Sequence, residues 1–105
     1  MLDVRAEVID EAPTPGFTTT FSYDVIDRAD KVTDEEFERI RDSVAKWARS
    51  NRVGFELEKT RKGFEVMLYH SIPDGDSYGM SLFLHLSKGV FRQIEREKRS
   101  TQILS

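Results

Sequence analysis

Two histidines are the residues of this chain best suited to general acid–base chemistry, because imidazole titrates near neutral pH. His70 and His85 fall in segments that we expect to be adjacent strands, and pairing Tyr69 with Ser81 would place Glu65 opposite His85. No motif ties a nucleophilic Ser or Thr to this pair, and it lacks a third metal ligand. We therefore interpret it as a cross-strand contact and expect no enzymatic activity, no metal and no cofactor.

The acidic residues around Gly75 resemble a fragment of a calcium loop, since Asp74 and Asp76 supply carboxylates at alternate positions. A calcium loop needs further oxygen ligands, and here the residues after Asp76 lead into an expected strand. We interpret the segment as a turn. Glycine-rich phosphate-binding motifs are also absent from the sequence.

Basic residues suggest a nucleic-acid-binding surface. Lys88, Arg92, Arg96 and Arg99 recur at helical spacing and would form one stripe on a C-terminal helix. A hairpin loop adds Lys59, Arg61 and Lys62. Together they could contact a phosphate backbone, although Glu95 and Glu97 dilute the positive charge. Nucleic-acid binding is therefore kept as the alternative function.

The strongest binding candidate is apolar. Met67, Tyr69, Phe83 and His85 are expected on the outer face of the sheet, which makes that face too apolar for free solvation. The C-terminal tail, with Ile103 and Leu104, or the second helix could cover it. Alternatively, the face binds another protein or a second copy of this chain.

Hydrophobic alternation predicts the first strands. Leu2, Val4, Ala6 and Val8 alternate with polar residues, which predicts a strand over 2–9. A loop with two prolines follows, and then a strand over 17–26 completes an N-terminal hairpin, 1–26.

A helix over 33–50 has the clearest start signal. Thr33 and Glu36 form a capping box, while Val32 and Phe37 can pack as a hydrophobic staple. The next expected unit is a three-stranded meander over 52–86, whose first hairpin pairs Glu58 with Gly63. Its third strand covers 80–86. A C-terminal helix, 87–99, and a tail, 100–105, complete the chain.

The sequence therefore predicts one α+β domain over 1–105. Its elements follow the order ββαβββα, with a four- to five-stranded antiparallel sheet and two helices packed on one face. Residues 33–99 resemble double-stranded-RNA-binding domains in their αβββα order, and in that order alone, so no family is assigned.

Composition narrows the function. The 105 residues are 38% hydrophobic and 33% charged, with no cysteine, which suits a folded domain without disulfides or thiol chemistry. No apolar run approaches the roughly 20 residues of a membrane span, and no secretory signal is evident, so we expect a cytoplasmic protein. The net charge of −3 hides an acidic N-terminal part, with 12 acidic and 5 basic residues in 1–42.

These features favour a small non-catalytic protein-binding module. By size and elimination, an inhibitor, an immunity or antitoxin protein, or a phage-type antagonist is expected. It would act by steric occlusion of a partner protein, with the acidic part steering it toward a basic surface.

Overall fold

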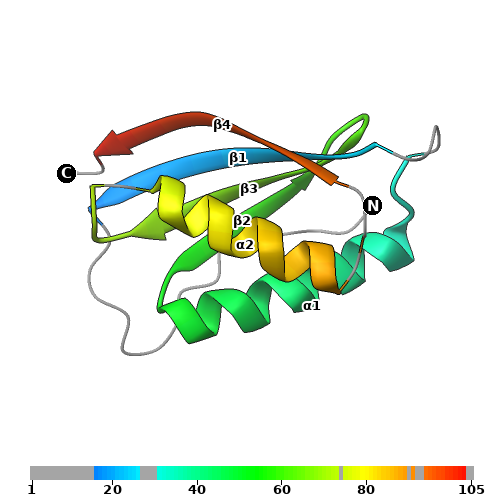
Figure 1. Ribbon diagram of the computed structural model, residues 1–105, viewed down its shortest axis with the longest axis horizontal. Helices are drawn as coiled ribbons and strands as arrows, with labels where there is room; N and C mark the ends of the chain where they lie inside the picture. Colours follow the sequence, from blue (N-terminus) through cyan, green and yellow to red (C-terminus); the bar gives the residue numbers. More distant parts are fainter. Residues whose placement is uncertain (1–15, 27–30, 74, 90, 92–93, 104–105) are drawn as a thin grey trace.

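The structure is a computed structural model that describes residues 16–26, 31–73, 75–89, 91 and 94–103 (Figure 1). Along the chain, the elements are β1 (Phe17–Val25), α1 (Asp34–Asn51), β2 (Gly54–Lys59), β3 (Gly63–His70), α2 (Asp76–Lys88) and β4 (Ile94–Ile103). The strand expected over 2–9 lies outside the described residues.

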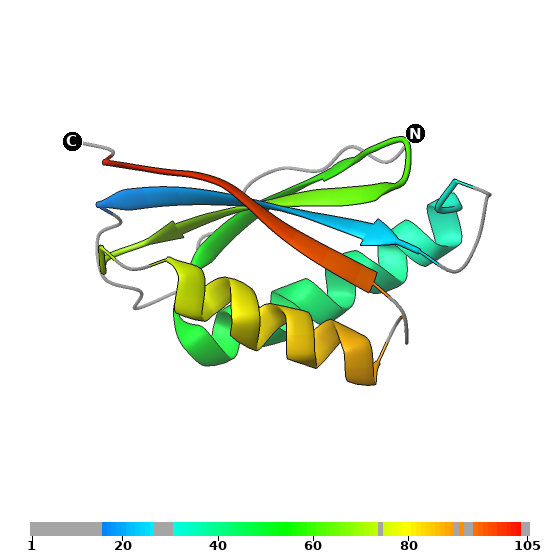
Figure 2. The same ribbon diagram turned by 45° about the horizontal axis from the view of Figure 1, so that its top comes forward.

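The four strands form one antiparallel sheet in the order β2-β3-β1-β4. Figure 2 shows both helices below this sheet, on one of its faces. The order βαββαβ with β1 and β3 in the centre is the split βαβ, or ferredoxin-like, arrangement. The predicted α+β class and antiparallel sheet are confirmed, whereas the predicted order ββαβββα is wrong.

Helix α1 begins where the sequence predicts. The Glu36 amide donates to Thr33 Oγ1 at 3.1 Å, and the Thr33 amide donates to Glu36 Oε1 at 2.9 Å, which completes the capping box. The helix ends at Asn51, and the C-cap residue Arg52 has a left-handed backbone with φ 57°. Its inner stripe is buried and consists of Phe37, Ile40, Val44, Trp47 and Ala48.

The β2–β3 hairpin forms, but its register differs from the expected one by two residues. Glu58 lies opposite Glu65, and Phe55 lies opposite Leu68, so Glu58 does not pair with Gly63. Gly63 instead lies opposite Asp24 of β1. Because side chains alternate with a period of two, an even shift leaves every side chain on its expected face. The apolar pattern could therefore specify the buried face without specifying the register.

The C-terminal third of the chain contradicts the sequence prediction. The expected strand 80–86 is part of helix α2, and the expected helix 87–99 is largely replaced by strand β4. Leu82 and Leu86, one helical turn apart, are fully buried, whereas Met80 and Leu84 are 46% and 52% exposed. A short apolar run fits both the period of two of a strand and the period of 3.6 of a helix, which explains why the prediction of a strand was wrong.

The residues of β4 form a strand although their intrinsic preference is for a helix. Its segment Glu95–Arg99 consists of good helix formers. Tertiary pairing with β1 decides its conformation, since Ile94 pairs with Val25 and its side chain is 5% exposed in the core. The register shifts by one residue beside Thr20, which leaves Arg99 as the extra residue of a bulge.

Helix α2 packs very closely on the sheet at Gly79. A Cβ atom built there would lie 2.2 Å from Cε1 of Phe21 and 2.8 Å from Nη1 of Arg96. The carbonyl oxygen of Gly79 accepts a hydrogen bond from the Tyr23 hydroxyl at 3.3 Å. The absence of a side chain at this position thus sets the distance between α2 and β1.

We predict that Gly79→Ala destabilises the fold by about 1–3 kcal/mol, although alanine is the better helix former, because the added methyl group overpacks the interface. The matched control is Gly89→Ala at the end of α2, where the nearest atom to an added Cβ is 3.7 Å away. Urea unfolding of both variants measures the difference. Equal stability of the two variants would contradict close packing at Gly79.

Candidate functional site

The four residues predicted to bind a partner lie on opposite sides of the sheet, two on each side. Met67 and Tyr69 lie half-buried on the sheet face opposite the helices, and the Tyr69 hydroxyl donates to Met67 Sδ at 3.3 Å. Burial, reinforced by the nearby Glu56 carboxylate, raises the pKa of Tyr69 to about 12.

Phe83 and His85 belong to α2, on the other side of the sheet. Phe83 packs against the core, and His85 Nε2 lies 3.1 Å from the Ser43 carbonyl oxygen of α1. The predicted Glu65–His85 pair is therefore wrong, and Ser22 Oγ donates to Glu65 Oε2 at 3.3 Å. Because residues 76–88 form a helix and not the expected strand, His85 does not lie opposite Glu65.

The predicted basic stripe does not exist as a helix face. Lys88 ends α2, Arg96 lies on β4, Arg92 is outside the described residues, and Arg99 is in β4. Arg96 Nη1 contacts Asp76 Oδ1 at 2.9 Å, and its guanidinium lies 5.5 Å from the Phe21 ring centre.

The basic residues of the β2–β3 hairpin also do not form the surface that the sequence predicted. Lys59 Nζ lies 2.6 Å from Asp34 Oδ1, and this hydrogen bond lowers the pKa of Asp34. Arg61 and Lys62 are exposed in the turn between β2 and β3. The six of these bases that the structure describes come from the β2–β3 hairpin, the end of α2 and β4, and two of them, Lys59 and Arg96, already pair with aspartates of this chain.

His70 is buried in a polar cluster that the sequence did not indicate. Its Nε2 lies 2.7 Å from Thr19 Oγ1, which lies 3.1 Å from Thr101 Oγ1. The His70 ring also stacks on Phe17 and contacts Tyr78, with ring centres 5.9 and 5.2 Å apart. A hydroxyl beside an imidazole is the geometry of an activated nucleophile. However, Thr19 and His70 are 0% and 1% exposed, so a substrate cannot reach them in this conformation.

The segment around Gly75, which the sequence predicted to be a turn between strands, leads into helix α2. Gly75 is the N-cap of α2, and a Cβ atom there would lie 2.2 Å from Thr19 Oγ1. The hydrogen bond from Arg96 lowers the pKa of Asp76, and Asp74 is outside the described residues. Within the described ranges, no three His, Asp or Glu residues are grouped as metal ligands, and no helix is long and apolar enough to span a membrane.

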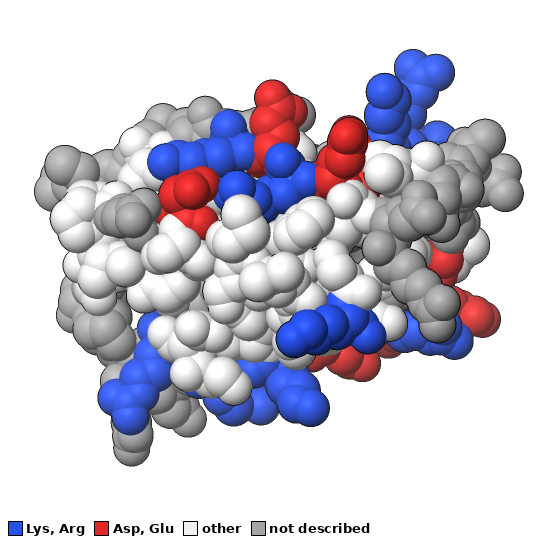
Figure 3. All heavy atoms as spheres, in the orientation of Figure 1, with Lys and Arg blue, Asp and Glu red and all other residues white. Residues whose placement is uncertain are grey.

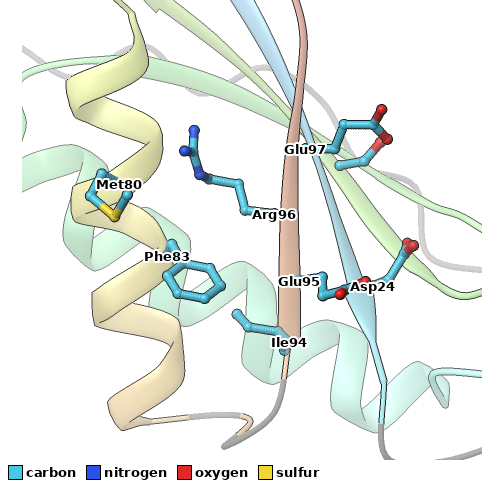
Figure 4. A pocket seen from close by; sticks show the side chains of 8 residues that line it. Asp24, Met80, Phe83, Ile94, Glu95, Arg96 and Glu97 are labelled. Atoms are coloured by element: carbon cyan, nitrogen blue, oxygen red, sulfur yellow. The ribbon is translucent and has the colours of Figure 1, made fainter.

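A groove of about 500 Å³ lies along β4, and we call it the α2–β4 groove (Figure 4). Met80 and Phe83 of α2 lie on the helix side of β4, together with Arg96. Glu95 and Glu97 lie on the other side of the strand. The complete lining is Ser22, Asp24, Met80, Phe83, Ile94, Glu95, Arg96 and Glu97.

Sequence reasoning found Phe83 but missed Met80 and Leu84, which it assigned to the core. The signal was available. Counting Gly79, Leu82 and Leu86 as one helical face, at spacings of three and four, places Met80 and Leu84 outside that face.

Comparison with protein-family models, curated proteins and solved structures finds no match to this chain.

We predict that the free energy of unfolding decreases as the pH falls from about 7 to about 5.5, a window above the usual titration of carboxylates. Burial lowers the pKa of His70 in the folded state. The unfolded chain therefore binds the proton more readily, and stability falls below the unfolded pKa near 6.5, by at most about 1.4 kcal/mol per pH unit. Urea unfolding at several pH values measures this slope. It should flatten in His70→Gln, and an unchanged slope in that variant would contradict the assignment.

Proposed function

We propose that this protein is a small non-catalytic protein-binding module that acts by sterically occluding its partner, and that α2 provides the principal contact. One observation carries the proposal. Met80 and Leu84, successive apolar residues on the same side of α2, are 46% and 52% exposed.

The charge distribution of α2 supports this interpretation. Its only Asp, Glu, Lys or Arg residues are Asp76 and Lys88, at its two ends. Figure 3 shows a band without these charged residues over α2, between the charged residues of β4 above and others below. Single exposed apolar side chains are common, but two of them, Met80 and Leu84, on one side of a helix that has no charged residue between its ends are typical of an interaction surface.

The chemistry of the exposed residues also suits a protein partner. Methionine adapts its shape to different partners, and aromatic residues such as Phe83 are enriched at the centre of interfaces. Ser77 and Ser81 of the same helix are exposed as well, but Ser81 Oγ accepts a hydrogen bond from Trp47 Nε1 at 2.9 Å. That bond fixes α2 on α1, so Met80 and Leu84 are held on a rigid support.

The proposal is tested by site-specific photo-crosslinking. A benzoylphenylalanine placed at Leu84 should capture one protein from an extract of the source cells, and the same group at Arg49 on α1 should not. The captured protein is then purified, and its affinity for the unmodified chain is measured by calorimetry.

We predict that Met80→Glu and Leu84→Glu each weaken this affinity by about 30-fold or more, because an interface anchor contributes about 2 kcal/mol. Since both side chains are half exposed, stability should change by about 0.5 kcal/mol or less. Arg49→Glu is the matched control and should leave the affinity unchanged. Tight binding by both α2 variants would refute the proposal.

A further inference from the structure

Among the strands that the structure describes, β4 forms the edge of the sheet beside α2. β4 is last in the order β2-β3-β1-β4, so β1 is its only neighbour among the described strands. An edge strand presents unpaired backbone N–H and C=O groups along its outer side. Extended peptides bind such edges by adding a strand, with backbone hydrogen bonds for affinity and alternate side chains for specificity.

The two sides of β4 differ in chemistry. On the helix side, the α2–β4 groove offers the apolar side chains of Met80, Phe83 and Ile94, beside Arg96, whose guanidinium is paired with Asp76. On the other side, it offers three carboxylates, those of Asp24, Glu95 and Glu97, and none of them forms an ion pair with a described residue.

These carboxylates are also placed unfavourably for the isolated chain. Asp24 and Glu95 lie directly opposite each other in the β1–β4 ladder. Like charges in directly opposite positions destabilise a sheet, and a cation placed between them would relieve the repulsion.

We propose that the partner adds an extended segment to β4 as a fifth strand, and that apolar residues alternate with Lys or Arg in this segment. Because successive side chains of a strand point to opposite faces, one set would enter the apolar side of the groove and the other set would reach Glu95 and Glu97. This inference rests on the proposed protein-binding function and specifies how the partner is recognised.

A second copy of β4 is a poor occupant of the same edge. Antiparallel pairing of two identical strands about a two-fold axis places same-face residues opposite each other. Glu95 and Glu97 share one face, and Arg96 and Lys98 share the other. Self-pairing would therefore oppose acid to acid and base to base, which disfavours a second copy and favours a segment of complementary charge.

The test uses a short acetylated peptide in which Leu and Val alternate with Lys, titrated into the ¹⁵N-labelled full chain. The expected result is that amide shifts and new protection from hydrogen exchange concentrate on residues 94–98 and on the adjacent side of α2. A peptide of the same sequence with alternate backbone amides methylated should bind at least tenfold more weakly, because it cannot complete the ladder.

Two double variants of the protein locate the charge contacts. Glu95→Lys with Glu97→Lys should weaken binding of the unmethylated peptide about tenfold or more. Glu56→Lys with Glu58→Lys makes the same charge change on β2, at the opposite edge, and should change the affinity by less than about threefold. Equal binding of both peptides, equal loss in both double variants, or shifts that map to β2 would overturn strand addition.

The outcomes also separate this inference from the proposed function. If the Leu84 photo-crosslink captures a partner whose affinity is unchanged by the Glu95 and Glu97 substitutions, strand addition is wrong and the protein-binding function stands. If Met80→Glu and Leu84→Glu leave the partner's affinity unchanged, the function itself is wrong.

Discussion

The close packing of α2 on β1 is the constraint on which the rest of the structure depends. Two glycines permit it, since a Cβ atom at Gly75 would meet Thr19 Oγ1 at 2.2 Å and one at Gly79 would meet the Phe21 ring at the same distance. The backbone of the helix therefore rests almost directly on the side chains of the strand. Any larger residue at these positions must push α2 outward, and the groove beside β4 would change its shape with it.

Around this contact, polar side chains join α2 to α1 and to β4. Trp47 binds Ser81, His85 meets the Ser43 carbonyl, and Arg96 joins β4 to Asp76 at the start of α2. With one side of α2 buried on the sheet and another fixed to α1, the remaining side must face solvent or a partner. That side carries Met80 and Leu84, so the apolar surface follows from how the helix is held.

The sequence predicted the first two-thirds of the described fold well and the last third poorly, for physical reasons. Helix α1 carries its own start signal in Thr33 and Glu36, and the β2–β3 hairpin follows an alternation that only one period fits. In α2, the run Leu82–Leu86 fits both periods. In β4, helix-forming side chains adopt a strand because β1 offers an edge, and local propensity does not contain that information. The predicted binding site was wrong for the same reason. Phe83 and His85 were assigned to a strand, but they belong to helix α2 and lie on the other side of the sheet.

The central claim is that the surface formed by α2 and β4 binds another protein. Hydrogen–deuterium exchange, measured on this chain alone and saturated with the partner captured through Leu84, tests it most directly. The account predicts slowed exchange in β4 over residues 94–98 and in α2 beside it. Slowed exchange confined to β2 and the outer parts of α1, with β4 unchanged, would contradict it.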